Sequence, residues 1–180
     1  MRFRVLAVSG SLRAVSTNTG LLQAAQVLAD SLFDVALYEG LADLPHFNPD
    51  HDGDVLPSTV AGWRRAVGEA DALLISTPEY ARGIPGSLKN ALDWLVGDPH
   101  FAGKPVAIFS ASPRAVEAHK ALTLTLKTMS VDLLEAAAVT VPLLGRPATV
   151  EHILADGALT AEIRTGLALL HQALEERRAV

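Results

Sequence analysis

Short apolar runs alternate along the chain with segments of helical periodicity, and this alternation restricts the possible fold more than any other feature. The strand-like runs are residues 3–8, 32–37, 72–76, 104–110 and 131–141. The segments with helical spacing are residues 18–29, 58–70, 86–96, 115–129 and 161–178, with Ser58 as a candidate cap. Strands that alternate with helices are typical of a parallel sheet covered by helices on both faces. The sequence therefore predicts an α/β fold, and its 180 residues suit one domain, 1–180.

Residues 121–127 do not fit this pattern by periodicity alone, because apolar and polar residues alternate there as in a strand. They lie, however, between two runs that are expected to be buried strands. Parallel neighbours need a crossover of about a dozen residues or more, and the crossover is usually helical. We therefore predict a helix over 115–129.

Composition argues against several classes of protein. The chain has no cysteine, which excludes disulfides and thiolate chemistry and suits the cytoplasmic location that we expect. The net charge is −5 and the Lys and Arg residues are scattered, so we expect no nucleic-acid partner. No apolar run approaches the roughly 18–20 residues of a membrane span, and the run within MRFRVLAVSGS is too short for the core of a signal peptide. We therefore expect no membrane partner.

Open parallel sheets bind ligands beyond the carboxyl ends of their strands. The segments in that position are SGSLRAVSTN (9–18), TPEYARGIPG (77–86) and SASPRAV (110–116). These three loops are therefore the candidate binding site.

The first loop has the composition of a phosphate cradle. It carries three serines, a threonine, an asparagine and Arg13, and it leads into the helix predicted from Asn18. A helix N-terminus offers unpaired N–H groups and a positive dipole end, and an arginine adds a charge-assisted contact. Alternatively, Ser16 or Asn18 only caps the helix.

Other phosphate-binding motifs do not match. The dinucleotide fingerprint G-x-G-x-x-G is absent, and so is a Walker loop. The nearest candidate, residues 97–105, has one residue too many between its glycines and precedes a strand instead of a helix. A receiver domain is excluded as well, because no acidic residues follow the first strand.

The second loop is rich in turn residues, with two prolines and two glycines in TPEYARGIPG. Turns at Pro78 and at Pro85-Gly86 would direct backbone amides above the edge of the sheet. A flat heteroaromatic ring needs such amides for its carbonyls, with a side chain such as Tyr80 against it. The alternative is an ordinary turn with Pro near the start of a helix.

Two motifs together carry a resemblance to a known family. GSLRAVSTN, followed at this distance by TPEYARGIPGSLKNALDW, resembles the NADPH-dependent FMN reductases, a family that includes quinone, chromate and azo reductases. The similarity is continuous to about Trp94 and weaker beyond. It implies a flavodoxin-like three-layer sandwich with a five-stranded parallel sheet in the order 2-1-3-4-5 and helices on both faces.

The resemblance also implies the cofactor-binding residues. FMN phosphate would be bound by the first loop, and the isoalloxazine ring by main-chain groups of the second; two serines of the third loop would approach the ring or the ribityl chain. The residues are Ser11, Arg13, Ser16, Thr17, Asn18, Pro78, Glu79, Tyr80, Ala81, Arg82, Ser110 and Ser112. The chain departs from the common family pattern at Ala81, Arg82 and Arg114.

The resemblance implies a ping-pong reaction, in which NAD(P)H passes hydride to FMN and the reduced ring then reduces a quinone, azo compound, metal oxyanion or free flavin. No protein side chain is required as acid or base, since the cofactor supplies the chemistry. Relatives form dimers or tetramers through the helix that starts at Gly86, so we expect a homo-oligomer. The alternatives are a non-enzymatic flavodoxin-like electron carrier and a phosphate- or nucleotide-binding regulatory module.

Several other polar residues have a more ordinary interpretation. Lys89 and Asp93 lie four apart on the predicted helix and suit an ion pair, and Trp94 suits the core or an interface. His119 lies on the crossover helix, either towards a substrate or half exposed. The loop with His46, Asp50, His51, Asp52 and Asp54 fails the EF-hand pattern, so we expect a solvated loop and no metal site.

Overall fold

The computed structural model describes residues 2–29, 31–147 and 149–179. Its centre is a parallel sheet whose strands β1 (Phe3–Ser9), β2 (Phe33–Leu37), β3 (Ala72–Ser76) and β4 (Pro105–Ser110) follow the order β2-β1-β3-β4-β5. This order and the α/β class confirm the predicted flavodoxin-like sheet.

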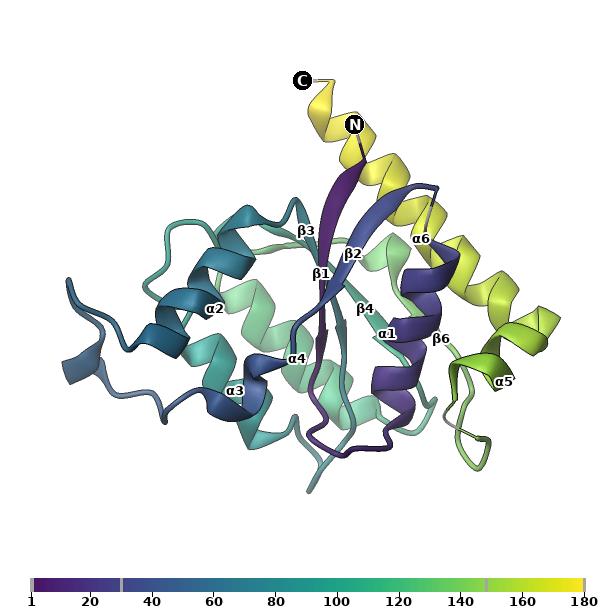
Figure 1. Cartoon of the computed structure of the whole chain (residues 1–180), viewed down its shortest axis with the longest axis horizontal. Coiled ribbons are helices and arrows are strands. Elements are labelled where there is room, and N and C mark those ends of the chain that lie inside the picture. Colours follow the sequence, from purple (N-terminus) through teal and green to yellow (C-terminus); the bar gives the residue numbers. More distant parts are fainter. Residues whose placement is uncertain (1, 30, 148, 180) are drawn as a thin grey trace.

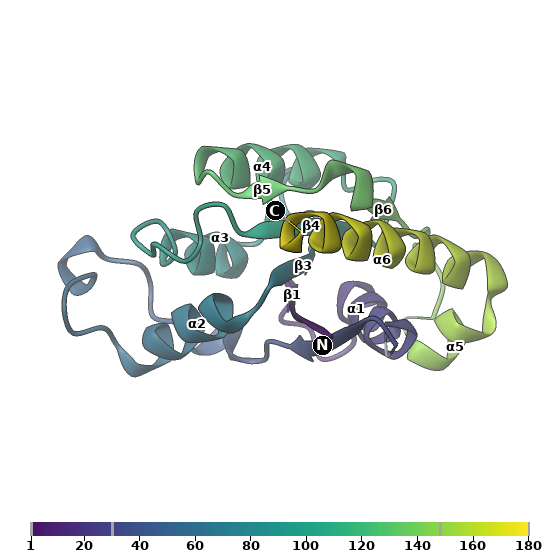
Figure 2. The same cartoon turned by 90° about the horizontal axis from the view of Figure 1, so that it is seen from above.

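Helices cover both faces of the sheet and make three layers (Figures 1 and 2). One face is covered by α1 (Thr17–Leu28), α5 (Val150–Ala155) and α6 (Gly157–Arg178); the other is covered by α2 (Ser58–Glu69), α3 (Gly86–Asp93) and α4 (Val116–Thr128). Successive residues of a strand point to opposite faces. Val5 and Ala7 of β1 accordingly pack towards α1 and α6, whereas Leu6 and Val8 pack towards α2 and α3.

The predicted fifth strand, 131–141, is interrupted. It consists of β5 (Asp132–Leu133), a 3-10 turn η3 (Glu135–Ala137) and β6 (Val139–Thr140), and both short strands pair with β4. The pairs Val106–Leu133 and Phe109–Val139 are separated by three residues on β4 but by six on the edge strand. The three extra residues cannot stay in register and form the turn, which buries Ala137 in the core.

The helices follow the predicted segments with four differences, the first of which is that α3 ends at Asp93, three residues before the predicted end. The crossover helix α4 confirms the prediction over 115–129. Helix α5 was not predicted, and α6 begins at Gly157, four residues before the predicted start, because Asp156 caps it through the N–H groups of Ala158 and Leu159. Ser58 is not a cap: Pro57 precedes α2 and no side chain caps this helix. Two further 3-10 turns, η1 (Gly40–Asp43) and η2 (Pro49–His51), lie in the segment between β2 and α2.

The segment before α2 is fastened to α3. Trp94 is fully buried and its Nε1 donates to the carbonyl of Pro45 at 2.8 Å, and Asn90 donates to the same carbonyl at 2.9 Å. Lys89 and Asp93 form the predicted ion pair at 2.5 Å. Within the described ranges, no helix is both long and apolar enough to cross a membrane.

Close packing between α6 and the sheet depends on Gly166. A Cβ at this position would lie 2.7 Å from Phe109 Cζ and 2.9 Å from Val139 Cγ1. We expect Gly166→Ala to lower the free energy of unfolding by about 1–3 kcal/mol, because overpacking outweighs the gain in helix propensity. Gly62→Ala is the control: nothing lies within 4 Å of its Cβ in α2, so it should stabilise by about 0.5–1 kcal/mol. Urea unfolding measures both, and a stabilised Gly166→Ala would contradict this packing.

Candidate functional site

Three loops meet at the carboxyl ends of β1, β3 and β4, at the lower end of the sheet in Figure 1. A cavity of about 340 Å³, which we call the edge cavity, lies between them. Its lining residues are Thr17, Asn18, Thr77, Pro78, Glu79, Ala111, Ser112, Arg114, Ala115 and Leu144. The three predicted loops therefore come together. Leu144 was missed by the sequence analysis because it follows the interrupted edge strand.

The first loop folds back on itself through serine hydroxyls. The N–H of Ser11 donates to Ser9 Oγ at 3.3 Å, and the N–H of Arg13 donates to Ser11 Oγ at 3.4 Å. Ser9 Oγ also lies 2.8 Å from Thr19 Oγ1, which ties the end of β1 to the first turn of α1. The Arg13 side chain is exposed and has no ion pair within the described part of the chain.

The N-terminus of α1 opens into the edge cavity. Ser16 caps it, since Ser16 Oγ accepts from the N–H of Thr19. The N–H groups of Thr17 and Asn18 have no hydrogen-bond acceptor among residues 2–29, 31–147 and 149–179. Ser16 thus does cap the helix, and two amides still remain for an anion.

Asn18 has a structural contact as well as a place in the edge cavity. Its Oδ1 accepts from Ser76 Oγ at 2.9 Å, and both residues are buried. Gly10 allows this close approach between the first two loops, because a Cβ there would lie 2.4 Å from Thr77 Oγ1. The end of β3 therefore holds the start of α1 in place.

The second loop contains a two-residue hairpin turn. Tyr80 and Gly83 exchange both main-chain hydrogen bonds at 3.0 Å, with Ala81 and Arg82 between them. Their φ angles are 48° and 60°, in the left-handed region that such turns require and that usually favours Asn-Gly. Pro78 and Glu79 line the edge cavity, whereas Tyr80, Ala81 and Arg82 lie on the hairpin beside it.

The carboxylate of Glu79 caps α4. Glu79 Oε2 accepts from the N–H of Glu117 at 2.9 Å and from that of Ala118 at 3.0 Å. The residue at the N-cap position, Ala115, has no side chain that could do this. Glu79 therefore joins the loop after β3 to the helix after β4, a role that the sequence analysis did not assign.

The third loop is closed by its two predicted serines. Ser110 Oγ donates to the carbonyl of Ser112 at 2.9 Å, and Ser112 Oγ accepts from the N–H of Arg114 at 3.1 Å. Ser112 and Arg114 line the edge cavity, whereas Ser110 does not. Arg114 thus contributes a second exposed guanidinium to this end of the sheet, in addition to that of Arg13.

Large apolar side chains are exposed on the segments around the edge cavity. They belong to the first loop, the hairpin, the start of α4 and the segment after β6: Leu12, Val15, Tyr80, Val116 and Leu144. Exposed apolar side chains near a cavity with both polar and apolar lining groups suit a flat organic ligand or a second protein surface.

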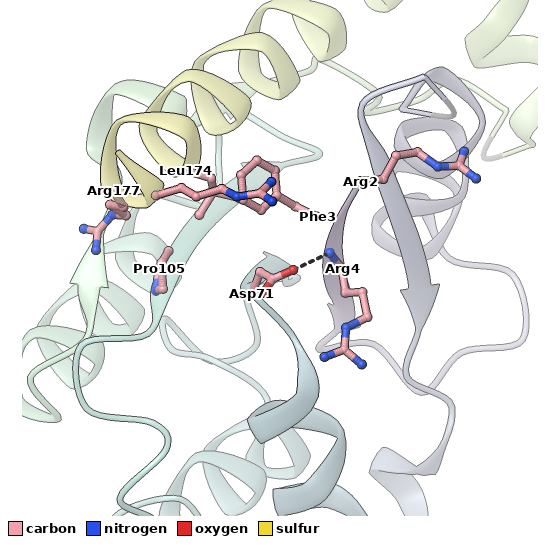
Figure 3. A pocket seen from close by; sticks show the side chains of 8 residues that line it. Arg2, Phe3, Arg4, Asp71, Pro105, Leu174 and Arg177 are labelled. Atoms are coloured by element: carbon pink, nitrogen blue, oxygen red, sulfur yellow. Dashed lines mark hydrogen bonds between the residues drawn. The ribbon is translucent and has the colours of Figure 1, made fainter. Parts of the chain in front are cut away.

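A larger cavity, about 450 Å³, lies at the opposite, amino-terminal end of the sheet and is lined in part by Arg2, Arg4 and Arg177. Figure 3 shows that these three side chains extend in different directions instead of converging. Arg177 pairs with Asp132, and Asp71 accepts from the main-chain N–H of Arg4 at 2.7 Å. Arg178 also lines this cavity, and its Cζ lies 5.7 Å from the centroid of the Phe3 ring.

Comparison with known proteins agrees with the loop arrangement. A family model described as NADPH-dependent FMN reductase matches residues 3–143. The chain belongs to this family. The match confirms the resemblance drawn from the two loop motifs, and the edge cavity lies at the carboxyl edge of the sheet where that resemblance places FMN.

Individual FMN reductase relatives match part of the sequence. The chain is 40% identical over 119 residues to the 2-hydroxy-1,4-benzoquinone reductase of a Burkholderia species, which covers 64% of each chain. It is 38% identical over 117 residues to a quinone reductase of Pseudomonas putida, covering 63% of this chain and 62% of the relative. The matches thus span less than two thirds of the length of these curated relatives.

Solved structures match over nearly the whole chain. The flavoenzyme NAD(P)H:(acceptor) oxidoreductase FerB of Paracoccus denitrificans superposes with a TM-score of 0.73 at 27% identity, covering 94% of this chain and 98% of FerB. An apo NADH:FMN oxidoreductase superposes with a TM-score of 0.68 at 23% identity, which supports the fold alone.

The left-handed turn predicts an unusual response to glycine. Ala81→Gly should raise the free energy of unfolding by about 0.5–1 kcal/mol, because an L-residue in this region costs about 1–2 kcal/mol and glycine costs less. Ala61→Gly on the exposed surface of α2 is the matched control and should destabilise by about 1 kcal/mol. Denaturant unfolding measures both; equal destabilisation would show that the turn is not strained.

The cap provided by Glu79 can be tested by its removal. Glu79→Ala should destabilise the protein by about 1–2 kcal/mol, because two N–H groups of α4 lose their acceptor. Hydrogen exchange should speed up first at the amides of Glu117 and Ala118. Glu162→Ala, at an exposed position of α6, is the control and should change stability by less than about 0.5 kcal/mol. Unchanged exchange at α4 in Glu79→Ala would rule out the cap.

Proposed function

We propose that this chain is an FMN-dependent NAD(P)H oxidoreductase that reduces small-molecule acceptors by a ping-pong mechanism. The observation that carries the proposal is the edge cavity: the open N-terminus of α1 and the loops after β3 and β4 meet there, in a member of the FMN reductase family. The donors present fit FMN. Arg13 and the free amides of Thr17 and Asn18 suit a phosphate, and main-chain groups near Pro78 suit a polar ring edge.

Each predicted residue has a task in this proposal. Ser11, Ser16 and Arg13 hold the phosphate with the N-terminus of α1. Pro78, Glu79 and Tyr80 lie along the ring through their main chain, and the hairpin of Ala81 and Arg82 borders the mouth. Ser110 shapes the third loop, and Ser112 faces the ribityl chain or the ring.

The chemistry is then divided between cofactor and protein. When bound, FMN would accept a hydride from NAD(P)H and pass reducing equivalents to the acceptor. The protein binds and orients it: the positive end of the α1 dipole and Arg13 fix the phosphate, and amides at the ring edge favour negative charge there. The exposed side chains of Leu12 and Val15, with Leu144 in the cavity lining, suit flat apolar acceptors such as quinones, azo compounds and free flavin more than metal oxyanions.

The assembly and location are part of the same proposal. We propose a single domain over 1–180 that forms a homodimer or homotetramer in the cytoplasm, with α3 in the contact. Tyr80 and Val116 each follow a residue that lines the edge cavity, and their side chains are exposed. A contact between two copies at this place would bury their apolar surface. Small-molecule acceptors are then the other partners, without nucleic acid or membrane.

The proposal is tested by FMN titration and by reduction of the bound flavin. The protein should bind FMN, and NAD(P)H should bleach its visible absorption without oxygen until a quinone is added. Arg13→Ala should raise the Kd for FMN about tenfold to hundredfold, because a charge-assisted contact contributes about 1.5–3 kcal/mol. Arg65→Ala, an exposed position of α2, should leave the Kd unchanged.

Each negative outcome has a defined meaning. A protein that binds no FMN would be a phosphate-binding module and not a reductase. A yellow protein that NAD(P)H cannot bleach would be an electron carrier. Equal Kd values for Arg13→Ala and Arg65→Ala would contradict the phosphate cradle.

A further inference from the structure

Two more cavities lie near the edge cavity and are lined in part by residues of α4. The inner cavity has a volume of about 10 Å³ and is lined by Thr77, Ile108, Phe109, Ser110, Ala115 and His119. The outer cavity, about 380 Å³, opens beside the interrupted edge strand and is lined by Ile108, His119, Lys120, Thr123, Leu133, Glu135 and Ala138.

The three cavities are adjacent. The edge and inner cavities share Thr77 and Ala115, and the inner and outer cavities share Ile108 and His119. The three cavities therefore lie next to one another near the N-terminus of α4, between the loop after β3 and the interrupted edge strand. His119 is the titratable residue at the point where the inner and outer cavities meet.

The inner cavity has the size and polarity of a site for one water molecule. A water needs about 10–15 Å³ and two to four polar partners. Thr77 Oγ1 donates to the carbonyl of Pro78 at 3.2 Å. Ser110 Oγ donates to the carbonyl of Ser112 and accepts from the N–H of Ser112 at 3.5 Å, so each hydroxyl oxygen keeps a lone pair that can accept from a water. His119 is the third polar residue of the lining.

The outer cavity also has the chemistry of a hydrated space. Thr123 Oγ1 is buried without a hydrogen-bond partner in the part of the chain that the structure describes, and such a group is usually satisfied by water. The charged groups that face His119 here are Lys120 on α4 and Glu135 on η3. The pKa of Glu135 is lowered, mainly by its hydrogen bond from Lys127 and also by the charge of His119.

We propose that His119 is a proton-relay residue, which passes protons from the outer cavity through one water in the inner cavity to a ligand in the edge cavity. This inference rests on the proposed function. Reduction of a quinone by NAD(P)H consumes one hydride and one proton: the nicotinamide C–H bond breaks, two O–H bonds form on the hydroquinone, and NAD(P)+ leaves. A flat acceptor that fills the mouth excludes solvent there, so a route from behind α4 supplies the proton.

The relay is tested by comparing acceptors that need protons with one that does not. His119→Gln should lower kcat with a benzoquinone about tenfold or more and remove one ionisation from its pH profile, because glutamine cannot exchange a proton in this range. Turnover with ferricyanide, which accepts an electron without a proton, should stay within about twofold of wild type. In His119→Ala, added imidazole should restore quinone turnover.

His51→Gln, on the exposed turn η2, is the matched control and should behave as wild type with both acceptors. The Kd for FMN should be unchanged in His119→Gln. A high-resolution crystal structure of the wild-type protein should show an ordered water between Thr77, Ser110 and His119.

Two results would contradict the relay but not the proposed function. One is an active wild type whose pH profile of quinone turnover is the same in His119→Gln, and the other is an inner cavity without an ordered water. An equal loss with quinone and ferricyanide would show that His119 is only structural. If the wild type binds no FMN, the proposed function fails first.

Discussion

The parallel pairing of β1 with β3 determines the geometry of the candidate site. The register places Ser9 beside Ser76, so the two strands end at the same level and their loops leave the sheet together. Gly10 can then donate its N–H to the carbonyl of Ser76 at 2.8 Å, and Asn18 can reach the hydroxyl of the same residue. A shift of one residue would turn every side chain of β1 to the other face of the sheet, and the core would be lost with the site.

Polar contacts hold the loops at this edge, in addition to the packing of Ala111 and Ile84 against the core. Serine and threonine hydroxyls close the first and third loops, and the carboxylate of Glu79 spans from the second loop to α4. Because these contacts use side chains, they leave main-chain amides at the N-terminus of α1 free to bind a ligand. Ser110 is a further example: its hydroxyl closes the third loop, and the residue also lines the inner cavity.

The sequence was enough to predict the alternating strands and helices and the three loops, because these depend on local periodicity or on turn residues. The crossover helix was predicted from topology instead, since residues 121–127 alternate as in a strand. It was not enough for features that depend on distant partners. The direction of the Glu79 carboxylate follows from the position of α4, and the place of Leu144 follows from the break in the edge strand. Residues 131–141 were interpreted as one strand because most of them are apolar, although Glu135 interrupts the run where the turn begins. The Ser58 cap failed because Pro57 already occupies the N-cap position.

The interrupted edge has a consequence for how copies of this protein can associate. A long, regular outer strand presents unpaired N–H and C=O groups to which another chain can add, and this is a common route to aggregation. Here β5 and β6 have two residues each and η3 turns the chain between them. That edge of the sheet offers no continuous template, so the addition of another strand is disfavoured there; the opposite edge is formed by the five-residue strand β2.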